Sequence, residues 1–201
     1  MKIIGLTGGI ACGKSTVSKA LRALGACIID ADAVAHELSQ PNQALFNAYV
    51  QRFGMAIVTP GGTLDRAVIA RLIFTDPTMR AEVEQISHPL IRRAVEERLR
   101  MAEKEQKRAA VLDVPLLFEA GWDALVDEVW VVALPPEEQL TRLLARDKTM
   151  SEGEARARIA AQMPLAEKCV RADVVIDNSG TKEETREYVG KLWEKRIFGR
   201  A

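Results

Sequence analysis

The sequence predicts an α/β fold, in which a five-stranded parallel sheet is flanked by helices. Five short apolar or β-branched runs alternate along the chain with longer segments that show helical periodicity. Strands separated by connections of helix length pair in parallel, because antiparallel neighbours need only a short turn. A chain of 201 residues with 48% hydrophobic residues is long enough to bury such a sheet within one domain.

Each of the five runs is short, rich in Val, Ile or Leu, and bounded by glycine, proline or charged residues. The expected strands are KIIGLT (2–7), ACIID (26–30), AAVLDV (109–114), EVWVVALPP (128–136) and ADVVID (172–177). A first helix is predicted from Lys14 to a stop at Gly25. Later helices are predicted over 137–147, over 151–163 with a capping-box start at Ser151, and over 181–197.

Residues 33–100 contain no good strand candidate and are predicted to form a helical insertion. Proline and glycine interrupt helices, so breaks are expected near Pro41, at 59–63, at Asp76–Pro77 and at His88–Pro89. A charged helix over 92–108 then leads into the third strand.

The composition is that of an ordinary soluble protein. The 28 basic and 28 acidic residues give no net charge, which argues against a general nucleic-acid binder. Three cysteines without a CxxC pair argue against a disulfide framework or a zinc site. No apolar run is long enough to span a bilayer, and the apolar start is too short for a signal peptide. We therefore expect a cytoplasmic protein, a monomer or weak homo-oligomer, that binds neither nucleic acid nor membrane.

The stretch GLTGGIACGKST (5–16) contains a complete phosphate-binding loop pattern, Gly-x4-Gly-Lys-Ser, between a predicted strand and a predicted helix. Glycines let backbone N–H groups turn toward phosphate oxygens, and the helix start adds a positive partial charge. Lys14 can neutralise the outer phosphates, and the Ser15 hydroxyl is placed to bind Mg²⁺. We expect ATP, with Mg²⁺, to contact Gly8, Gly9, Ile10, Ala11, Cys12, Gly13, Lys14, Ser15 and Thr16.

Cys12 admits two interpretations. It lies close to Lys14 and to a helix N-terminus, and both features can lower the pKa of a thiol. It is therefore either a small residue that simply fits the loop or an oxidant-sensitive switch.

Two further groups of residues predict a kinase. Asp30 and Asp32 follow the second predicted strand, at the sheet edge where open α/β sheets bind ligands. Asp32 is the predicted catalytic base or a holder of metal-bound water, and one of the two aspartates is expected to cap the next helix. Arg142 and Arg146 lie one helical turn apart and can close over the transferred phosphoryl group.

Other classes of nucleotide-binding protein fit less well. A GTPase-type switch normally reads guanine through an Asn-Lys-x-Asp element, and no asparagine here is followed by lysine. A kinase for another small acceptor, such as a nucleoside monophosphate, and a regulatory protein without turnover remain as alternatives. Asp32 and the arginine pair argue against the second, since a passive binder needs neither.

Six ordered motifs resemble one family, the dephospho-CoA kinases. They are GLTGGIACGKST, IIDADAVAHEL, GTLDRAVIARLIF, SHPLIR, VPLLFEAGW and ADVVIDNSG, and they span the chain from Lys2 to about Gly180. The resemblance implies a P-loop kinase fold that transfers a phosphoryl group from MgATP to the ribose 3′-hydroxyl of dephospho-CoA, the last step of coenzyme A biosynthesis. It also implies a nucleotide core (about 1–32, 108–135 and 170–201), a helical CoA-binding subdomain (about 33–107) and a lid (about 136–169).

The resemblance also assigns roles to residues of these motifs. Asp32 would be the catalytic base and Arg142, with Lys14, would act on the transferred phosphoryl group. Asn178 would lie beside the ATP base, and the insertion that a bare nucleotide acceptor would not need favours dephospho-CoA. The acceptor pocket would be lined by Asp65, Arg66, His88, Pro89, Leu116, Leu117, Phe118 and Glu119. Because His88 precedes a proline, an extended backbone that aims its ring outward is expected.

Overall fold

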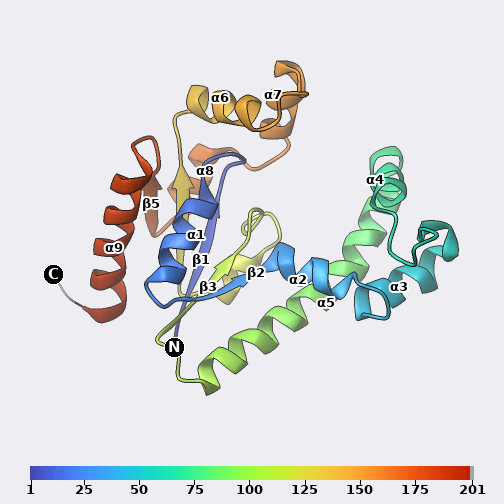
Figure 1. Cartoon of the computed structure of the whole chain (residues 1–201), viewed down its shortest axis with the longest axis horizontal. Helices are drawn as coiled ribbons and strands as arrows, with labels where there is room; N and C mark the ends of the chain where they lie inside the picture. The colour runs from blue at the N-terminus through green and yellow to red at the C-terminus, as the bar shows by residue number, and fades with distance from the viewer. Residues whose placement is uncertain (200–201) are drawn as a thin grey trace. The chain divides into compact units, whose positions relative to one another are not determined.

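The computed structural model describes residues 1–199, except for the side chains of residues 73–75 and 77 (Figure 1). Residues 200 and 201, the end of the predicted core segment 170–201, lie outside the described residues. The chain forms two compact units. Unit 1 combines Met1–Ile29 with the chain from Ala102 onward, and unit 2 is Asp30–Met101.

The sheet of unit 1 has five strands in the order β2-β3-β1-β4-β5. β1 pairs in parallel with β3 and with β4, and β4 pairs in parallel with β5, so the predicted five-stranded parallel sheet is confirmed. All their carboxyl ends therefore meet at one edge. The strands are β1 (Lys2–Gly8), β2 (Cys27–Asp30), β3 (Ala109–Asp113), β4 (Glu128–Ala133) and β5 (Val174–Asp177).

One face of the sheet is covered by α1 (Lys14–Ala23) and α9 (Lys182–Phe198), which lie side by side (Figure 1). Alternate residues of β1, β4 and β5 face these helices, as the two-residue repeat of a strand requires. Trp130 of β4 and Trp193 of α9 belong to this core and are almost fully buried. The opposite face of β1 has Gly5, where a Cβ would approach Leu117 to 3.0 Å. The missing side chain thus leaves room for Leu117 against the strand.

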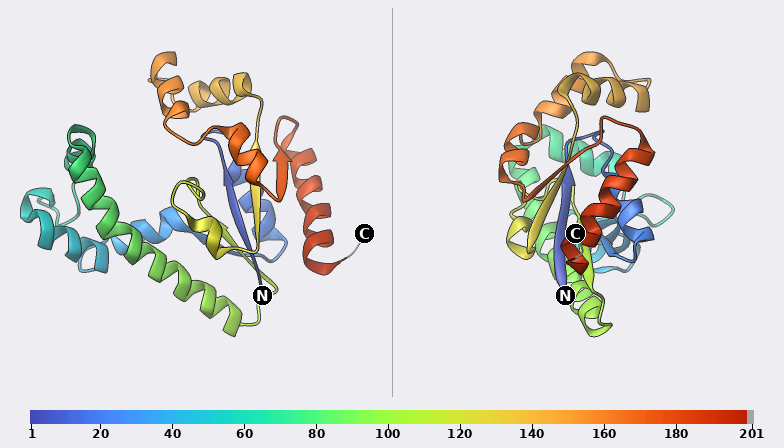
Figure 2. Two further views of the ribbon diagram at one scale, coloured as in Figure 1. Left: turned by 180° about the vertical axis from the view of Figure 1, so that it is seen from behind. Right: turned by 90° about the vertical axis from the view of Figure 1, so that its left-hand side faces the viewer.

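Beyond the carboxyl end of β4, the chain forms α6 (Pro136–Arg146), α7 (Glu152–Ala160) and α8 (Leu165–Arg171) (Figure 2). The Ser151–Glu154 capping box at the start of α7 is present as predicted. The short helix α8 was not expected from the sequence. The short 3-10 helix η2 (Trp122–Leu125) lies before β4.

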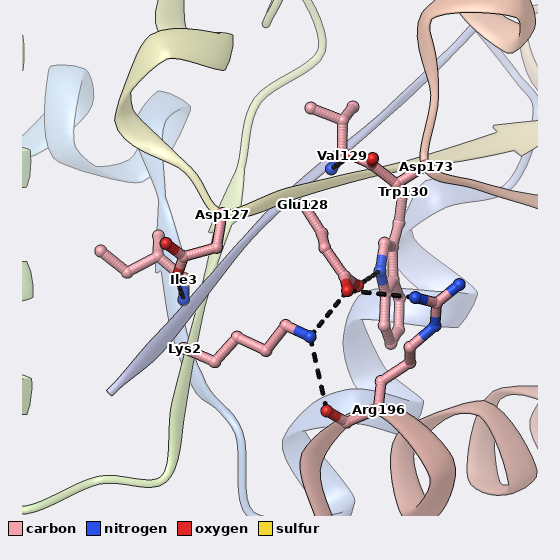
Figure 3. A network of polar contacts seen from close by, with 8 residues as sticks. All are labelled: Lys2, Ile3, Asp127, Glu128, Val129, Trp130, Asp173 and Arg196. Atoms are coloured by element: carbon pink, nitrogen blue, oxygen red, sulfur yellow. Dashed lines mark hydrogen bonds and ion pairs between the residues drawn. The ribbon is translucent and has the colours of Figure 1, made fainter. Parts of the chain in front are cut away.

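A polar network joins the start of β1, the start of β4 and the end of α9 (Figure 3). Glu128 accepts hydrogen bonds from Lys2 at 2.7 Å, from the Trp130 indole at 3.1 Å and from Arg196 at 3.2 Å. Burial acts to raise the pKa of the Glu128 carboxyl, but the hydrogen bonds from Lys2 and Trp130 outweigh it, and the pKa is lowered. This network therefore holds the amino ends of two strands to the last helix.

Unit 2 is helical, with one isolated antiparallel bridge between Val58 and Leu64. Its elements are α2 (Ala31–Leu38), α3 (Ala44–Phe53), η1 (Met55–Ile57), α4 (Arg66–Thr75) and α5 (Pro77–Lys104), of which the end from Ala102 onward belongs to unit 1. The helical insertion is confirmed, but the expected break at His88–Pro89 is wrong, because α5 continues through Pro89. Val83, Ile86 and Leu90 pack in one apolar cluster on both sides of this proline, and that packing opposes the local cost of the missing donor.

No helix within residues 1–199 is long and apolar enough to cross a membrane.

Candidate active site

The phosphate loop (residues 8–15) lies at the carboxyl end of β1, between the strand and α1. Gly13 has a φ of +87° and Ala11 a φ of +61°, both in the left-handed region that turns the chain sharply. Backbone hydrogen bonds from Cys12 to Gly9 (3.1 Å) and from Thr16 to Gly13 (2.8 Å) close the turn. The loop thus has the tight conformation that the spacing of its glycines predicts.

Gly8, at the end of β1, lies opposite Val132 of β4. A Cβ at this position would come within 2.5 Å of the Val132 carbonyl oxygen, so only glycine fits without a shift of the strands. Glycine at position 8 is therefore needed for the packing of β1 against β4 as well as for the phosphate loop.

Asn178 holds the other end of the phosphate loop. This buried residue follows β5, and its Nδ2 donates to the Cys12 carbonyl at 2.8 Å. Its Oδ1 accepts from the Thr185 hydroxyl at 2.8 Å, so the amide is fixed in orientation. A Cβ at Gly13 would lie 2.0 Å from Asn178 Nδ2. Asn178 therefore shapes the loop from behind, and its contact with the ATP base stays a prediction.

One cavity of unit 1, of about 350 Å³ and called the unit 1 cavity from here on, is lined by this loop. Its cationic side chains come from two elements: Lys14 from α1, and Arg142 and Arg146 from α6. Three cations around a ring of backbone N–H groups suit a polyanion. The lining residues are Gly8, Gly9, Ile10, Ala11, Gly13, Lys14, Ser15, Pro115, Arg142, Arg146 and Gln162.

Two of these cations have acidic partners. Lys14 pairs with Asp113, a buried carboxylate at the end of β3 whose role the sequence alone left undefined. Arg142 pairs with Glu138 one turn earlier, at 3.4 Å. Both side chains of the Arg142 pair are partly exposed, so this pair is weak and easily exchanged for a ligand.

Cys12, itself a residue of the phosphate loop, is fully buried. Burial raises the pKa of its thiol to about 11, although hydrogen bonds involving the backbone of Gly9 and Leu134 oppose the rise. A thiol with this pKa is almost entirely protonated at neutral pH and is a poor nucleophile. The structure therefore favours the first interpretation, a small residue that fits the loop, over an oxidant-sensitive switch.

The segment Leu116–Glu119 has three different environments. Leu116 is exposed, whereas Leu117 and Phe118 are buried within unit 1, and the place of these two in the acceptor pocket stays a prediction. Leu117 packs on Gly5, and the Arg171 guanidinium lies 4.2 Å from the centre of the Phe118 ring. These contacts pack both side chains within unit 1.

Glu119 is tied to a buried lysine. Lys168 of α8 has no exposed surface, and its Nζ contacts Glu119 Oε1 at 2.8 Å and the Pro115 carbonyl at 3.1 Å. Burial acts to raise the pKa of the Glu119 carboxyl, but hydrogen bonds from Lys168 and from the backbone, including Met163 N–H, outweigh it. The pKa is lowered, and Glu119 is ionised at neutral pH. A role of Glu119 in the acceptor pocket stays a prediction.

Unit 2 contains a second cavity, of about 440 Å³. Asp32 and His36 lie one turn apart on α2 and both line it, together with Arg66 from the start of α4. His36 Nδ1 and the Arg66 guanidinium are in contact. Apolar groups complete the wall, among them Leu45, Tyr49, Leu64 and Ile69.

The remaining predicted residues have other positions. The Asp30 carboxylate caps α2 by accepting from the N–H groups of Asp32 and Ala33, and this confirms that one of the two aspartates is a cap. Asp65 caps α4 in the same way and so fixes the start of the helix at Arg66. His88 and Pro89 are exposed in mid-helix, and neither they nor Asp65 lines the unit 2 cavity. The expected extended backbone at His88 is wrong, since α5 includes it.

Sequence reasoning missed several residues that shape these sites. Gln139, Gln162 and Lys168 bind to the loops of unit 1 from distant parts of the chain, and no local pattern marks them. His36 could have been predicted, because its spacing of four residues from Asp32 places both on one helix face.

The comparisons with known proteins agree with one another. A family model described as "Dephospho-CoA kinase" matches residues 2–184. A protein of that name from Symbiobacterium thermophilum is 50% identical over 199 residues, covering 99% of this chain and 83% of the relative. Another from Geobacter sulfurreducens is 47% identical over 197 residues, covering 98% of this chain and 100% of the relative.

Solved structures give the same result. "TT1252 from Thermus thermophilus" matches with a TM-score of 0.81 and 36% identity, covering 97% of each chain. "Dephospho-CoA kinase from Campylobacter jejuni" matches with a TM-score of 0.75 and 30% identity, covering 99% of each chain. A shikimate kinase from Bacteroides thetaiotaomicron shares the fold, with a TM-score of 0.51 and 14% identity.

Proposed function

Because the chain belongs to the dephospho-CoA kinase family, we propose that it transfers the γ-phosphoryl group of ATP to the ribose 3′-hydroxyl of dephospho-CoA, with unit 1 binding ATP. In the reaction, the 3′-oxygen forms a bond to the γ-phosphorus as the bond to the ADP oxygen breaks. The hydroxyl proton passes to a carboxylate. The products are coenzyme A and ADP.

Binding of ATP in the unit 1 cavity is supported by the loop and by its charges. Gly13, in the left-handed conformation, immediately precedes α1 and lines the cavity, and the N-terminus of α1 favours negative charge there. Lys14, Arg142 and Arg146 would neutralise the phosphates, and charge stabilisation of this kind provides most of the catalysis in phosphoryl transfer. This cationic cavity over a phosphate loop is the observation that carries the proposal.

The site also fits a nucleotide-bound Mg²⁺. Ser15 lines the cavity, and no group of three or more His, Cys, Asp or Glu side chains among the described residues could hold a metal unaided. Mg²⁺ usually takes one or two protein oxygens and completes its shell with water and substrate phosphates, so this sparse donor set is suitable. When bound, Mg²⁺ would neutralise charge on the β- and γ-phosphates, with Ser15 as its protein ligand.

For the acceptor, we propose Asp32 as the residue that receives the 3′-hydroxyl proton. Its carboxylate lies in the first turn of α2 and lines the unit 2 cavity with Arg66, which can bind an acceptor phosphate. The apolar wall of this cavity suits the uncharged parts of a pantetheine-bearing nucleotide. The exposed Leu116 of unit 1 stays a candidate acceptor contact.

The test is an ADP-release assay with MgATP and dephospho-CoA, run beside AMP and a control without acceptor, with the product identified by mass. ADP release that depends on dephospho-CoA and yields coenzyme A would support the proposal. Release with AMP alone, or equal release without an acceptor, would refute it.

The role of Asp32 has a matched control in Asp30. Asp32→Asn should lower kcat by about 10²- to 10⁴-fold with little change in ATP affinity, since only the base is lost. Asp30→Asn should keep near-normal kcat, because asparagine caps a helix as well as aspartate does. Equal effects of the two substitutions would show that Asp32 acts through the helix rather than as the base.

A further inference from the structure

The peptide groups of Ile10, in the middle of the phosphate loop, are held on both sides by glutamine side chains. Gln139 Nε2 donates to the Ile10 carbonyl at 3.0 Å. Gln162 Oε1 accepts from the Ile10 N–H at 2.9 Å. Gln139 lies on α6, and Gln162 lies between α7 and α8. One loop residue is thus fixed from two points of the segment 136–169, the lid segment.

The Gln139 side chain is buried against the phosphate loop. It is 4% exposed, in contrast to the charged residues beside it on α6. A Cβ at Gly9 would lie 2.5 Å from Gln139 Nε2, so the absence of a side chain at Gly9 gives the amide its place. The glycine at this position of the loop therefore has a packing role that the phosphate-binding pattern does not require.

Apolar contacts also join the phosphate loop to the lid segment. Leu140 and Leu143 of α6 form one buried cluster with Met150 and Ala155. Ile10 and Ala11 of the phosphate loop pack against this cluster, although they are far from it in sequence. The small core of the lid segment is thus completed by the loop that binds phosphate.

We infer that Gln139 and Gln162 are positioning residues, which fix the distance between the phosphate loop and the arginines of α6. Gln139 precedes Arg142 by three residues, so both lie on neighbouring parts of one helix face. A displaced α6 would move Arg142 and Arg146 relative to phosphates held on the loop. Because a misplacement of about 1 Å can cost about 10²-fold in rate, loss of either amide contact lowers the rate of transfer. The inference rests on the proposed function.

The test compares Gln139→Met and Gln162→Met with a matched control, Gln85→Met, on an exposed position of α5. Methionine keeps the length of glutamine and removes both the donor and the acceptor. The two loop variants should lower kcat at saturating ATP by about 10- to 100-fold, the size of effect that small misplacements produce. KM for dephospho-CoA should change less than kcat, and the control should match the wild type.

A double-mutant cycle with Arg142→Ala separates positioning from simple support of the fold. If each glutamine acts through the arginines, its substitution should cost little further activity in the Arg142→Ala protein. Losses that multiply in full, or a kcat equal to the wild type in the single variants, would overturn the inference. Gln162 is less buried than Gln139, so its variant gives the same test if Gln139→Met does not fold. An inactive wild type would refute the proposed function itself, whereas an active wild type with normal variants would refute only this inference.

Discussion

Substitution of Gly13 by alanine tests how rigidly the phosphate loop is held. The residue has a φ of +87°, where a side chain costs about 1–2 kcal/mol. The new Cβ would also lie 2.0 Å from Asn178 Nδ2, so the Asn178 amide must move. That movement gives up its buried hydrogen bonds to Cys12 and Thr185, which costs about 1–3 kcal/mol more. Gly13→Ala should therefore lower the free energy of unfolding by about 2–5 kcal/mol.

Gly25 provides the matched control at the other end of α1. Its φ is +92°, but no heavy atom lies within 4 Å of a Cβ built there. Gly25→Ala should therefore lose only the backbone part, about 1–2 kcal/mol. The difference between the two variants isolates the contact with Asn178.

Equilibrium urea denaturation followed by tryptophan fluorescence is the appropriate assay. The three tryptophans, at positions 122, 130 and 193, all belong to unit 1, so the signal follows the unit that contains both glycines. If the two variants are equally destabilised within about 0.5 kcal/mol, the Asn178 amide gives way freely, and it does not fix the loop.

Three other perturbations have clear expected outcomes. Lys168→Met should destabilise unit 1 by about 3 kcal/mol, since it leaves the Glu119 carboxylate without its buried partner; a midpoint in urea equal to the wild type would contradict this. Glu128→Gln should destabilise the protein at pH 7. Because the pKa of Glu128 is lowered in the folded state, its ionised carboxylate stabilises the protein above its ordinary pKa of 4.5, and this stabilisation is lost as the pH falls below that value. The melting temperatures of the variant and the wild type should therefore converge in acid. A difference in melting temperature that stays constant with pH would refute the assignment. Cys12 should resist iodoacetamide at pH 8 in the native protein, because the pKa of its thiol is about 11, and should react once the chain is unfolded; rapid native labelling by peptide mass would show an accessible thiolate.

The elements that the sequence predicts well are those set by local patterns. The phosphate loop, its strand and its helix are consecutive in sequence, and the capping box of α7 involves residues three apart. The break at Pro89 fails for the opposite reason. Proline removes one hydrogen bond locally, but the helix face on both sides of it packs against distant residues of unit 2, and burial of that face opposes the local cost.

The same distinction applies to the site. Lys14, Arg142 and Arg146 could be identified from spacing and charge, and the structure brings them to one cavity. Gln139 and Gln162 could not, since their partner Ile10 lies 129 and 152 residues earlier in the chain. A glutamine in a helix is usually a surface residue, and only tertiary structure shows that Gln139 is buried.

The topology of unit 1 has a consequence for synthesis on the ribosome. β1 is synthesised before its neighbours in the sheet, which are β3 and β4, with Lys2 opposite Ala109 and Ile4 opposite Glu128. At about 5–20 residues per second, the roughly 100 intervening residues take about 5–20 s to synthesise. During that interval the nascent chain exposes the apolar segment Ile3–Leu6 with no native strand to pair with, and by its end every residue of unit 2 has been made. Slower translation ahead of β3 should therefore lower the yield of folded protein, and a chaperone that shields the first strand should restore it.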